Sequence, residues 1–155
     1  MIYLGADHRG YQLKEKIKRW LKEWGWDYQD LGNTKYEPED DYPDFGKGVV
    51  AKLQSCKVAK KEKKDSATFG ILICGSGIGM SIVANRFPGV RCGLGFSAEQ
   101  VKRGREEDGI NCLALPADFI TEQKAKAIIK VFLETKFLGK EKYQRRIEKI
   151  EKNIG

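Results

Sequence analysis

A cysteine and a glycine-rich turn stand together in the middle of the chain, in the run Cys74-Gly75-Ser76-Gly77-Ile78-Gly79. Glycines at alternate positions let the backbone turn tightly and present several N–H groups at the start of a helix, which suits an anion. A cysteine near a helix N-terminus has its thiolate favoured. Such a thiolate could take a proton from carbon while the N–H groups stabilise the resulting oxyanion. From the spacing alone, it is equally plausible that Cys74 is a small, buried and unreactive residue.

The turn is not a P-loop, because no Lys-Ser or Lys-Thr pair follows it, and its glycine spacing does not match the dinucleotide-binding fingerprint. A second polar pair, Asp7 and His8, follows the first apolar run. These side chains are suited to binding sugar hydroxyls and to moving protons. His8 is the only histidine in the chain, so a mechanism that needs two histidines in one subunit is excluded.

The elements that must position these residues alternate between strand and helix. Continuous apolar runs at 2–6 and 69–74 are typical of parallel strands buried on both faces, whereas Leu13, Ile17, Leu21 and Trp24 recur with helical spacing. Further strands are predicted at 26–31, 90–95 and 112–115, and a polar loop at 33–43. Further helices are predicted at 44–56, from the glycine-rich turn to about 86, and at 98–107, 121–136 and 142–152.

This order predicts an α/β fold: a single Rossmann-like domain over residues 1–155, with three layers, a five-stranded parallel sheet, helices on both faces and a C-terminal helix. Ligands of such sheets bind beyond the carboxyl ends of the strands. Asp7, His8 and the Cys74 turn all follow strands directly. We therefore expect them to converge on one site.

The composition narrows the class of protein. The 155 residues carry a net charge of +7, part of it in a lysine-rich run from Lys57 to Lys64 that we interpret as a solvated helix end and loop. No zinc-finger or RRM signature accompanies this charge, so nucleic acid is not an expected partner. No apolar run approaches the roughly 20 residues of a membrane span.

The four cysteines lack the pairing of a zinc site and the density of a disulfide scaffold. We therefore expect free thiols and no metal. The N-terminus begins with an apolar strand pattern and shows no secretory signal. The expected location is the cytoplasm.

Several segments, in order along residues 2 to about 150, resemble the ribose-5-phosphate isomerase B family, which includes galactose-6-phosphate and allose-6-phosphate isomerases. The most specific is the Cys-Gly-Ser-Gly-Ile-Gly-Met-Ser run that starts at Cys74. The others are Gly5-Ala6-Asp7-His8-Arg9-Gly10, Asp41-Tyr42-Pro43, Ala84-Asn85-Arg86, Pro88-Gly89-Val90-Arg91 and Asn111-Cys112-Leu113-Ala114-Leu115.

The resemblance implies an aldose–ketose isomerase that needs no cofactor and converts ribose 5-phosphate to ribulose 5-phosphate through a cis-enediolate. It implies a homodimer or dimer of dimers whose active sites are built from both subunits. Cys74 would be the base, and Ser76 would support the sugar oxygens. The other implied substrate contacts are Asp7, His8, Tyr42, the backbone of Gly75, Gly77, Ile78 and Gly79, and a phosphate clamp of Lys142 and Arg146.

The chain departs from the family pattern at four positions, one of which is Lys142, where the family has an arginine. Glu107 stands where the family has a ring-opening histidine, and Asp108 stands where it has a substrate-binding asparagine. A carboxyl group can do acid–base work, so Glu107 is the candidate for ring opening. Asp118 replaces a basic residue. Either it points away, or Lys142, Arg146 and Arg9 hold the phosphate, or the substrate differs.

Two alternative functions therefore remain at this point. One is a hexose-6-phosphate isomerase acting on galactose or allose 6-phosphate. The other is a non-catalytic subunit that binds a sugar phosphate.

Overall fold

The computed structural model describes residues 1–59 and 67–152. Most of the lysine-rich run from Lys57 to Lys64 lies outside these ranges. Five parallel strands form one sheet in the order β2-β1-β3-β5-β4. Their bounds are β1 Ile2–Ala6, β2 Tyr28–Asp30, β3 Phe69–Cys74, β4 Cys92–Leu94 and β5 Cys112–Pro116.

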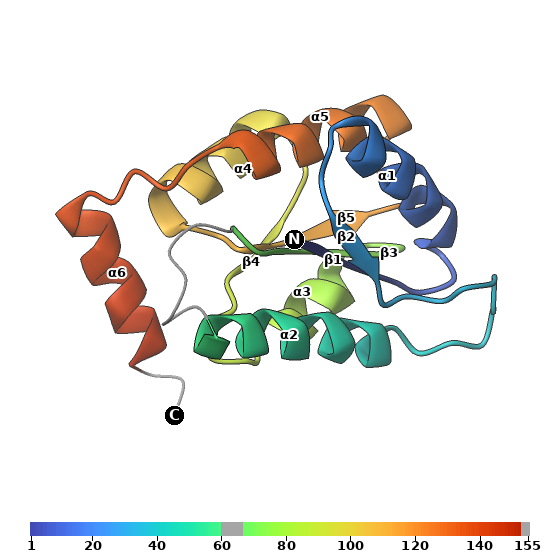
Figure 1. Ribbon diagram of the computed structural model, residues 1–155, viewed down its shortest axis with the longest axis horizontal. Coiled ribbons are helices and arrows are strands. Elements are labelled where there is room, and N and C mark those ends of the chain that lie inside the picture. Colours follow the sequence, from blue (N-terminus) through green and yellow to red (C-terminus); the bar gives the residue numbers. More distant parts are fainter. Residues whose placement is uncertain (60–66, 153–155) are drawn as a thin grey trace.

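Helices cover both faces of this sheet (Figure 1). On one face lie α1 (Tyr11–Glu23), α4 (Ala98–Arg103) and α5 (Glu122–Glu134), and on the other lie α2 (Tyr42–Ala59) and α3 (Ile78–Ala84). A short π-helix, η1 (Gly104–Asp108), continues α4, and α6 (Glu141–Glu151) ends the described chain. The predicted fold class, a five-stranded parallel α/β sheet of Rossmann type with a C-terminal helix, is confirmed.

Alternation along β3 explains why its whole sequence is apolar. Ile71 and Ile73 pack into the core under α1, α4 and α5, whereas Leu72 and Cys74 pack into the core against α2 and α3. Because β3 is central and covered on both faces, each of its six residues is buried. This pattern also directs the Cys74 side chain toward α2 and α3.

The strand order places the two candidate segments side by side. The strand that follows β1 in sequence, β2, lies at one edge of the sheet. The strands that follow β3, namely β4 and β5, lie on the other side of the two central strands. Connections that diverge in this way leave a crevice at the carboxyl ends of the two central strands. Asp7 follows β1 and Cys74 ends β3, so both lie at this crevice.

Most predicted boundaries differ from the observed ones by one to three residues, and three differences bear on the site. The helix predicted to begin at residue 44 begins at Tyr42, which places that tyrosine in the first turn of α2. The strand predicted at 90–95 is shorter, because only Cys92–Leu94 pair with β5. The helix predicted at 98–107 is α-helical only to Arg103 and then widens into the π-helix η1. Among the helices in the described ranges, none is long and apolar enough to cross a membrane.

A fully buried lysine joins α1 to the end of β2. The ammonium group of Lys14 lies 2.7 Å from Asp30 Oδ2 and donates to the carbonyl of Asn33 at 2.6 Å. Lys18 also pairs with Asp30, at 3.0 Å. Burial raises the pKa of Asp30, but the hydrogen bonds from Lys14 and Lys18 outweigh burial, so its pKa lies below the ordinary value.

We expect Asp30→Asn to destabilise the protein by about 3 kcal/mol at neutral pH, because it removes the nearer counterion of the buried Lys14 charge and, among the residues that the structure describes, leaves only Glu15, 3.4 Å away. A carboxyl whose pKa is depressed by folding contributes stability above its unfolded pKa of about 3.9 and loses it as the pH falls through the folded value. Urea unfolding at pH 7 and at pH 3 should therefore show the variant and the wild type converging in acid. Asp27→Asn, at an exposed position, is the matched control. A difference that stays constant with pH would contradict this account.

Candidate active site

A cleft of about 570 Å³ opens at the carboxyl ends of β1 and β3. Seven of the residues predicted from the sequence line it: Asp7, Tyr42, Cys74, Gly75, Ser76, Ile78 and Gly79. Three elements supply them, namely the end of β1, the start of α2 and the turn between β3 and α3. The expected convergence of the two segments therefore takes place in this cleft.

The turn after β3 is shaped around the Cys74 sulfur. Cys74 is 4% exposed, and its Sγ accepts the backbone N–H of Gly77 at 3.2 Å. A hydrogen-bond donor aimed at sulfur stabilises negative charge there, which a thiolate base requires. Gly77 has φ of +71°, and a Cβ at this position would lie 2.6 Å from Leu94 Cδ1. Only glycine therefore fits the position that presents this N–H.

Ser76 and Tyr42 form the wall beside the cysteine. The Ser76 hydroxyl accepts the N–H of Ile78 at 3.2 Å, which fixes the oxygen at the cleft surface. The Tyr42 ring lies so close to Gly79 that a Cβ there would be 2.7 Å from Cζ and 3.1 Å from the phenol oxygen. The phenol is thus held against the turn, where it can contact a ligand's oxygen atoms.

Asp7 is buried at the floor of the cleft, 5% exposed. Burial raises the pKa of its carboxyl above the ordinary value, although the Gly10 N–H, which donates to Oδ1 at 2.9 Å, partly offsets this effect. A carboxyl with a raised pKa exchanges protons more readily near neutral pH. Asp7 is therefore suited to proton transfer as well as to holding hydroxyl groups.

His8 is oriented by a partner that the sequence did not reveal. Its Nδ1 lies 2.7 Å from Asp40 Oδ1, and its backbone N–H donates to the same oxygen at 3.1 Å. The Asn33 side chain donates to the other oxygen of Asp40. Asp40 belongs to a polar loop of ordinary composition, so only its position in space identifies it. The pair fixes the imidazole beside Asp7.

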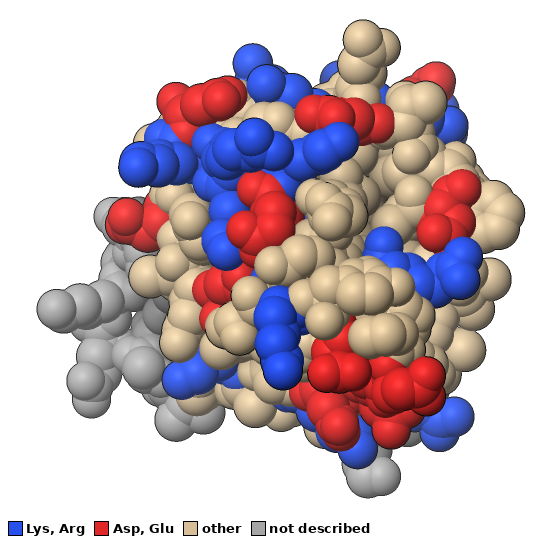
Figure 2. All heavy atoms as spheres, turned by 90° about the vertical axis from the view of Figure 1, so that its right-hand side faces the viewer, with Lys and Arg blue, Asp and Glu red and all other residues tan. Residues whose placement is uncertain are grey.

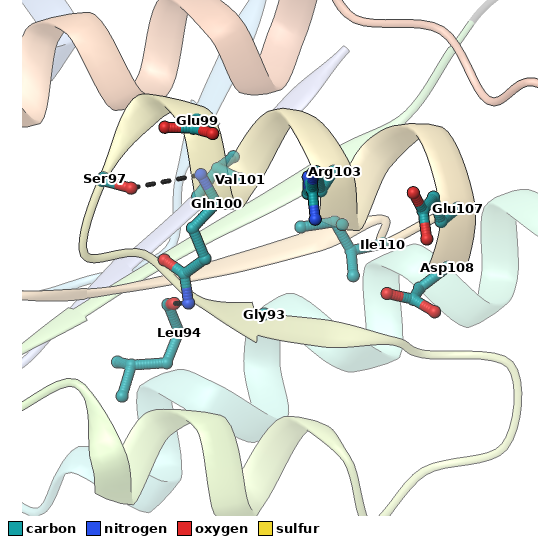
Figure 3. Close-up of a pocket in the computed structure, with 11 residues that line it drawn as sticks. Gly93, Leu94, Ser97, Glu99, Gln100, Val101, Arg103, Glu107, Asp108 and Ile110 are labelled. Atoms are coloured by element: carbon teal, nitrogen blue, oxygen red, sulfur yellow. Dashed lines mark hydrogen bonds between the residues drawn. The ribbon is translucent and has the colours of Figure 1, made fainter.

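Glu107 and Asp108 lie in a different cavity, of about 670 Å³, between β4 and the α4–η1 segment. Figure 3 shows both carboxylates at the η1 end of this cavity, with Arg103 from the preceding turn. Buried Arg105 holds η1 in place: its guanidinium stacks 4.6 Å from the centre of the Phe69 ring and donates to the carbonyl of Thr135 at 3.1 Å.

Lys142 and Arg146 occupy exposed positions on α6 and flank the ring of Tyr143, which is buried. Helix α6 lies at the opposite end of the molecule from the carboxyl ends of β1 and β3 (Figure 1). It lies instead beside η1. In the segment that leads into α6, the N–H of Leu138 donates to the carbonyl of Glu106 in η1 at 3.1 Å. One copy of the chain therefore carries the predicted site residues in two separate groups.

Arg9 and Asp118 also line the Cys74 cleft. Of the three alternatives for Asp118, the one in which it points away is wrong, because its carboxylate lies in the cleft and pairs with Arg9. The large apolar side chains of Ile82 and Phe119 line the cleft and are 53% and 70% exposed. The sequence did not predict either residue as part of the site, because both lie outside the recognisable motifs.

Charge on the face above the cleft is mixed. Figure 2, which looks onto the carboxyl ends of the strands, shows basic and acidic side chains next to one another over this face. The net charge of +7 therefore does not form a continuous basic surface there. Among the described residues, no group of three His, Cys, Asp or Glu side chains could hold a metal ion.

The comparisons with known proteins agree on one family. The family model described as Ribose/Galactose Isomerase matches residues 2–150. Ribose-5-phosphate isomerase B of Mycobacterium tuberculosis is 35% identical, over 95% of this chain and 85% of that protein. The crystal structure of the Thermotoga maritima isomerase of the same name superposes with a TM-score of 0.87 at 37% identity, covering 97% of both chains.

A further structure, ribose-5-phosphate isomerase B of Mycoplasma genitalium with bound ribulose-5-phosphate, superposes with a TM-score of 0.85 at 36% identity. It covers 97% of this chain and 93% of that one. These matches extend over nearly the whole sequence and include the Cys74 turn, both strands beside the cleft and helix α6. The chain belongs to the ribose/galactose isomerase family.

Proposed function

We propose that this protein is a ribose-5-phosphate isomerase of type B, which interconverts ribose 5-phosphate and ribulose 5-phosphate. The observation that carries the proposal is the Cys74 thiol at the floor of a cleft, with the Gly77 N–H directed at its sulfur. Relatives of about one-third identity bear this name, and one of them holds ribulose-5-phosphate. The test is turnover of ribose 5-phosphate by the purified protein, followed by the appearance of the ketose.

The proposed mechanism uses the open-chain aldose. The Cys74 thiolate removes the proton from C2, and the electron pair forms the C1–C2 double bond while the carbonyl oxygen at C1 becomes an oxyanion. Backbone N–H groups of Gly75–Gly79 and the Ser76 hydroxyl stabilise this cis-enediolate. The thiol then returns the proton to C1, and the proton of the C2 hydroxyl passes to the oxygen at C1, which yields the ketose. Asp7, beside the two oxygens, is suited to carry the proton between them.

The complete site is proposed to need two copies of the chain, as a homodimer or a dimer of dimers. Within one copy, Glu107 and Asp108 line a different cavity from Cys74, and Lys142 and Arg146 lie on α6 at the far end. These residues can serve the cleft of a second copy but not that of their own. The spacing of Lys142 and Arg146, four residues apart on one helix face, suits a clamp on one phosphate.

Pentose phosphate is proposed over hexose phosphate because the similar proteins named above are ribose-5-phosphate isomerases. Parallel assays with ribose 5-phosphate, galactose 6-phosphate and allose 6-phosphate decide the point. Turnover by the purified homo-oligomer would rule out a purely binding subunit. Free thiols at Cys74, Cys92 and Cys112 suit a reducing compartment, which supports a cytoplasmic location.

Glu107 is proposed to open the furanose ring in place of a histidine. We expect Glu107→Gln to lower kcat/KM for ribose 5-phosphate by about 10²-fold, the lower end of the range for a lost general acid–base. The measurement is steady-state kinetics at several pH values. Glu106→Gln, at the neighbouring position of η1, is the control. Unchanged kinetics in Glu107→Gln would remove the residue from the mechanism.

A further inference from the structure

Arg9 is the one basic residue that lines the Cys74 cleft within the part of the chain that the structure describes. The cleft also contains two carboxylates, those of Asp7 and Asp118. A sugar phosphate carries a dianion, and two carboxylates without a cation would repel it. How Arg9 is held therefore decides whether this cleft can accept the substrate that the proposed function requires.

Asp118 binds one side of the Arg9 guanidinium. Asp118 Oδ2 accepts Nε of Arg9 at 2.7 Å and lies 2.5 Å from Nη2. Hydrogen bonding and charge attraction from Asp118 raise the pKa of Arg9. Nη1 makes no hydrogen bond to any residue that the structure describes, and a guanidinium has five N–H donors in a rigid plane. The outer edge, Nη1 and Nη2, thus remains able to bind an anion bidentately.

The pair is built onto the turn that carries the cysteine. The N–H of Asp118 donates to the carbonyl of Gly75 at 3.0 Å, and the N–H of Ala117 donates to the carbonyl of Cys74 at 2.9 Å. A Cβ at residue 75 would lie 2.6 Å from Asp118 Oδ2 and 2.7 Å from Arg9 Nε. Gly75 therefore provides the space in which the ion pair sits, and the backbone fixes the pair relative to Cys74.

We infer that Arg9 is the cation that each subunit contributes to the substrate phosphate in its own cleft, and that Asp118 is a positioning residue that orients Arg9. The inference rests on the proposed function for the identity of the anion. It reconciles the carboxylate at position 118 with a phosphate ligand. Asp118 faces the inner edge of the guanidinium, and the phosphate binds the outer edge. Lys142 and Arg146 of a second copy would then supply the remaining charge.

The test measures binding of inorganic phosphate and kinetics with ribose 5-phosphate in the same variants. We expect Arg9→Ala to raise the Kd for phosphate and the KM for ribose 5-phosphate by about 10- to 100-fold, with a much smaller change in kcat. Arg19→Ala, at an exposed position of α1, is the matched control and should match the wild type. Melting temperatures verify that each variant is folded.

Asp118→Ala should raise the same two constants less than Arg9→Ala, and the double variant should be no worse than Arg9→Ala alone, because Asp118 acts only through Arg9. The charge-swapped variant Arg9→Ala/Asp118→Arg should recover phosphate binding, since it returns a cation to the same part of the cleft. A merely structural role for the pair predicts lower melting temperatures without this recovery.

The two proposals fail in different ways. Unchanged phosphate binding and unchanged KM in Arg9→Ala, in a protein that does isomerise ribose 5-phosphate, would overturn the inference and leave the proposed function intact. Loss of phosphate binding in Arg9→Ala, in a protein that converts no sugar phosphate, would support the anion site and overturn the proposed function. Strictly additive effects of the two single variants would overturn the positioning role of Asp118.

Discussion

Replacing Cys74 with alanine is expected to lower kcat for ribose 5-phosphate by about 10²- to 10⁴-fold, the range for a lost general acid–base group. The thiol is the group at the cleft floor that can take a proton from carbon, and its sulfur already receives the Gly77 N–H. Because proton transfer is the chemical step, kcat should fall while KM changes little. Steady-state kinetics with ribose 5-phosphate measure both constants.

Cys74→Ser refines the same experiment. A serine hydroxyl can still accept the Gly77 N–H, so the turn should keep its shape, but the hydroxyl is a far weaker acid than a thiol and should not restore turnover. Cys92→Ala, which removes a half-buried thiol from β4, is the matched control and should keep full activity. Wild-type kcat in Cys74→Ala, or equal losses in Cys92→Ala, would exclude the thiol as the base.

The strands and helices around Cys74 were predictable, because burial of one or both faces of an element produces a regular pattern of apolar residues in the sequence. The central strand β3 is covered on both faces, so its six residues form a continuous apolar run. Helix α1 shows its buried face as Ile17 and Leu21 at helical spacing. Helix α5, whose buried residues recur at the same spacing, was found in the same way. Patterns of this kind need no knowledge of distant contacts.

Features that depend on distant contacts were not predictable. Lysine side chains are usually solvated, yet Lys14 is fully buried because Asp30 and the Asn33 carbonyl receive its ammonium group. Arg105, in η1, is likewise buried, and its partners Phe69 and Thr135 lie on β3 and after α5. The spacing of apolar residues along the sequence does not indicate these distant partners.

In the candidate site, too, some features could be predicted from local sequence patterns and others depend on distant contacts. Adjacency to β1 and β3 was enough to bring Asp7 together with Cys74, because parallel strands end at one edge of the sheet. Asp40 and Asp118 lie in loops, and only the folded chain shows that they face His8 and Arg9. The separation of Glu107 and Lys142 from the cleft likewise follows from the position of η1 and α6 rather than from any motif.

The distance between helix α6 and the cleft of the same copy leads to the second prediction with a large expected effect. Lys142→Ala/Arg146→Ala should lower kcat/KM for ribose 5-phosphate by about 10²-fold or more, since each lost bond to a charged phosphate costs about tenfold or more. Both positions are exposed on α6, so folding should be unaffected. Arg145→Ala/Lys149→Ala removes two exposed cations with the same spacing from the same helix and should keep near-normal activity.

Mixing two inactive variants then tests whether the site is shared between copies. A dimer of one Cys74→Ala chain and one Lys142→Ala/Arg146→Ala chain has a single intact site only if the cleft and the clamp come from different copies. Random reassembly of equal amounts should therefore restore about a quarter of wild-type activity, because half of the dimers are mixed and each has one working site of two. If the clamp served its own cleft, every site in the mixture would lack either the thiol or the cations. No activity would return, and the proposed sharing would be refuted.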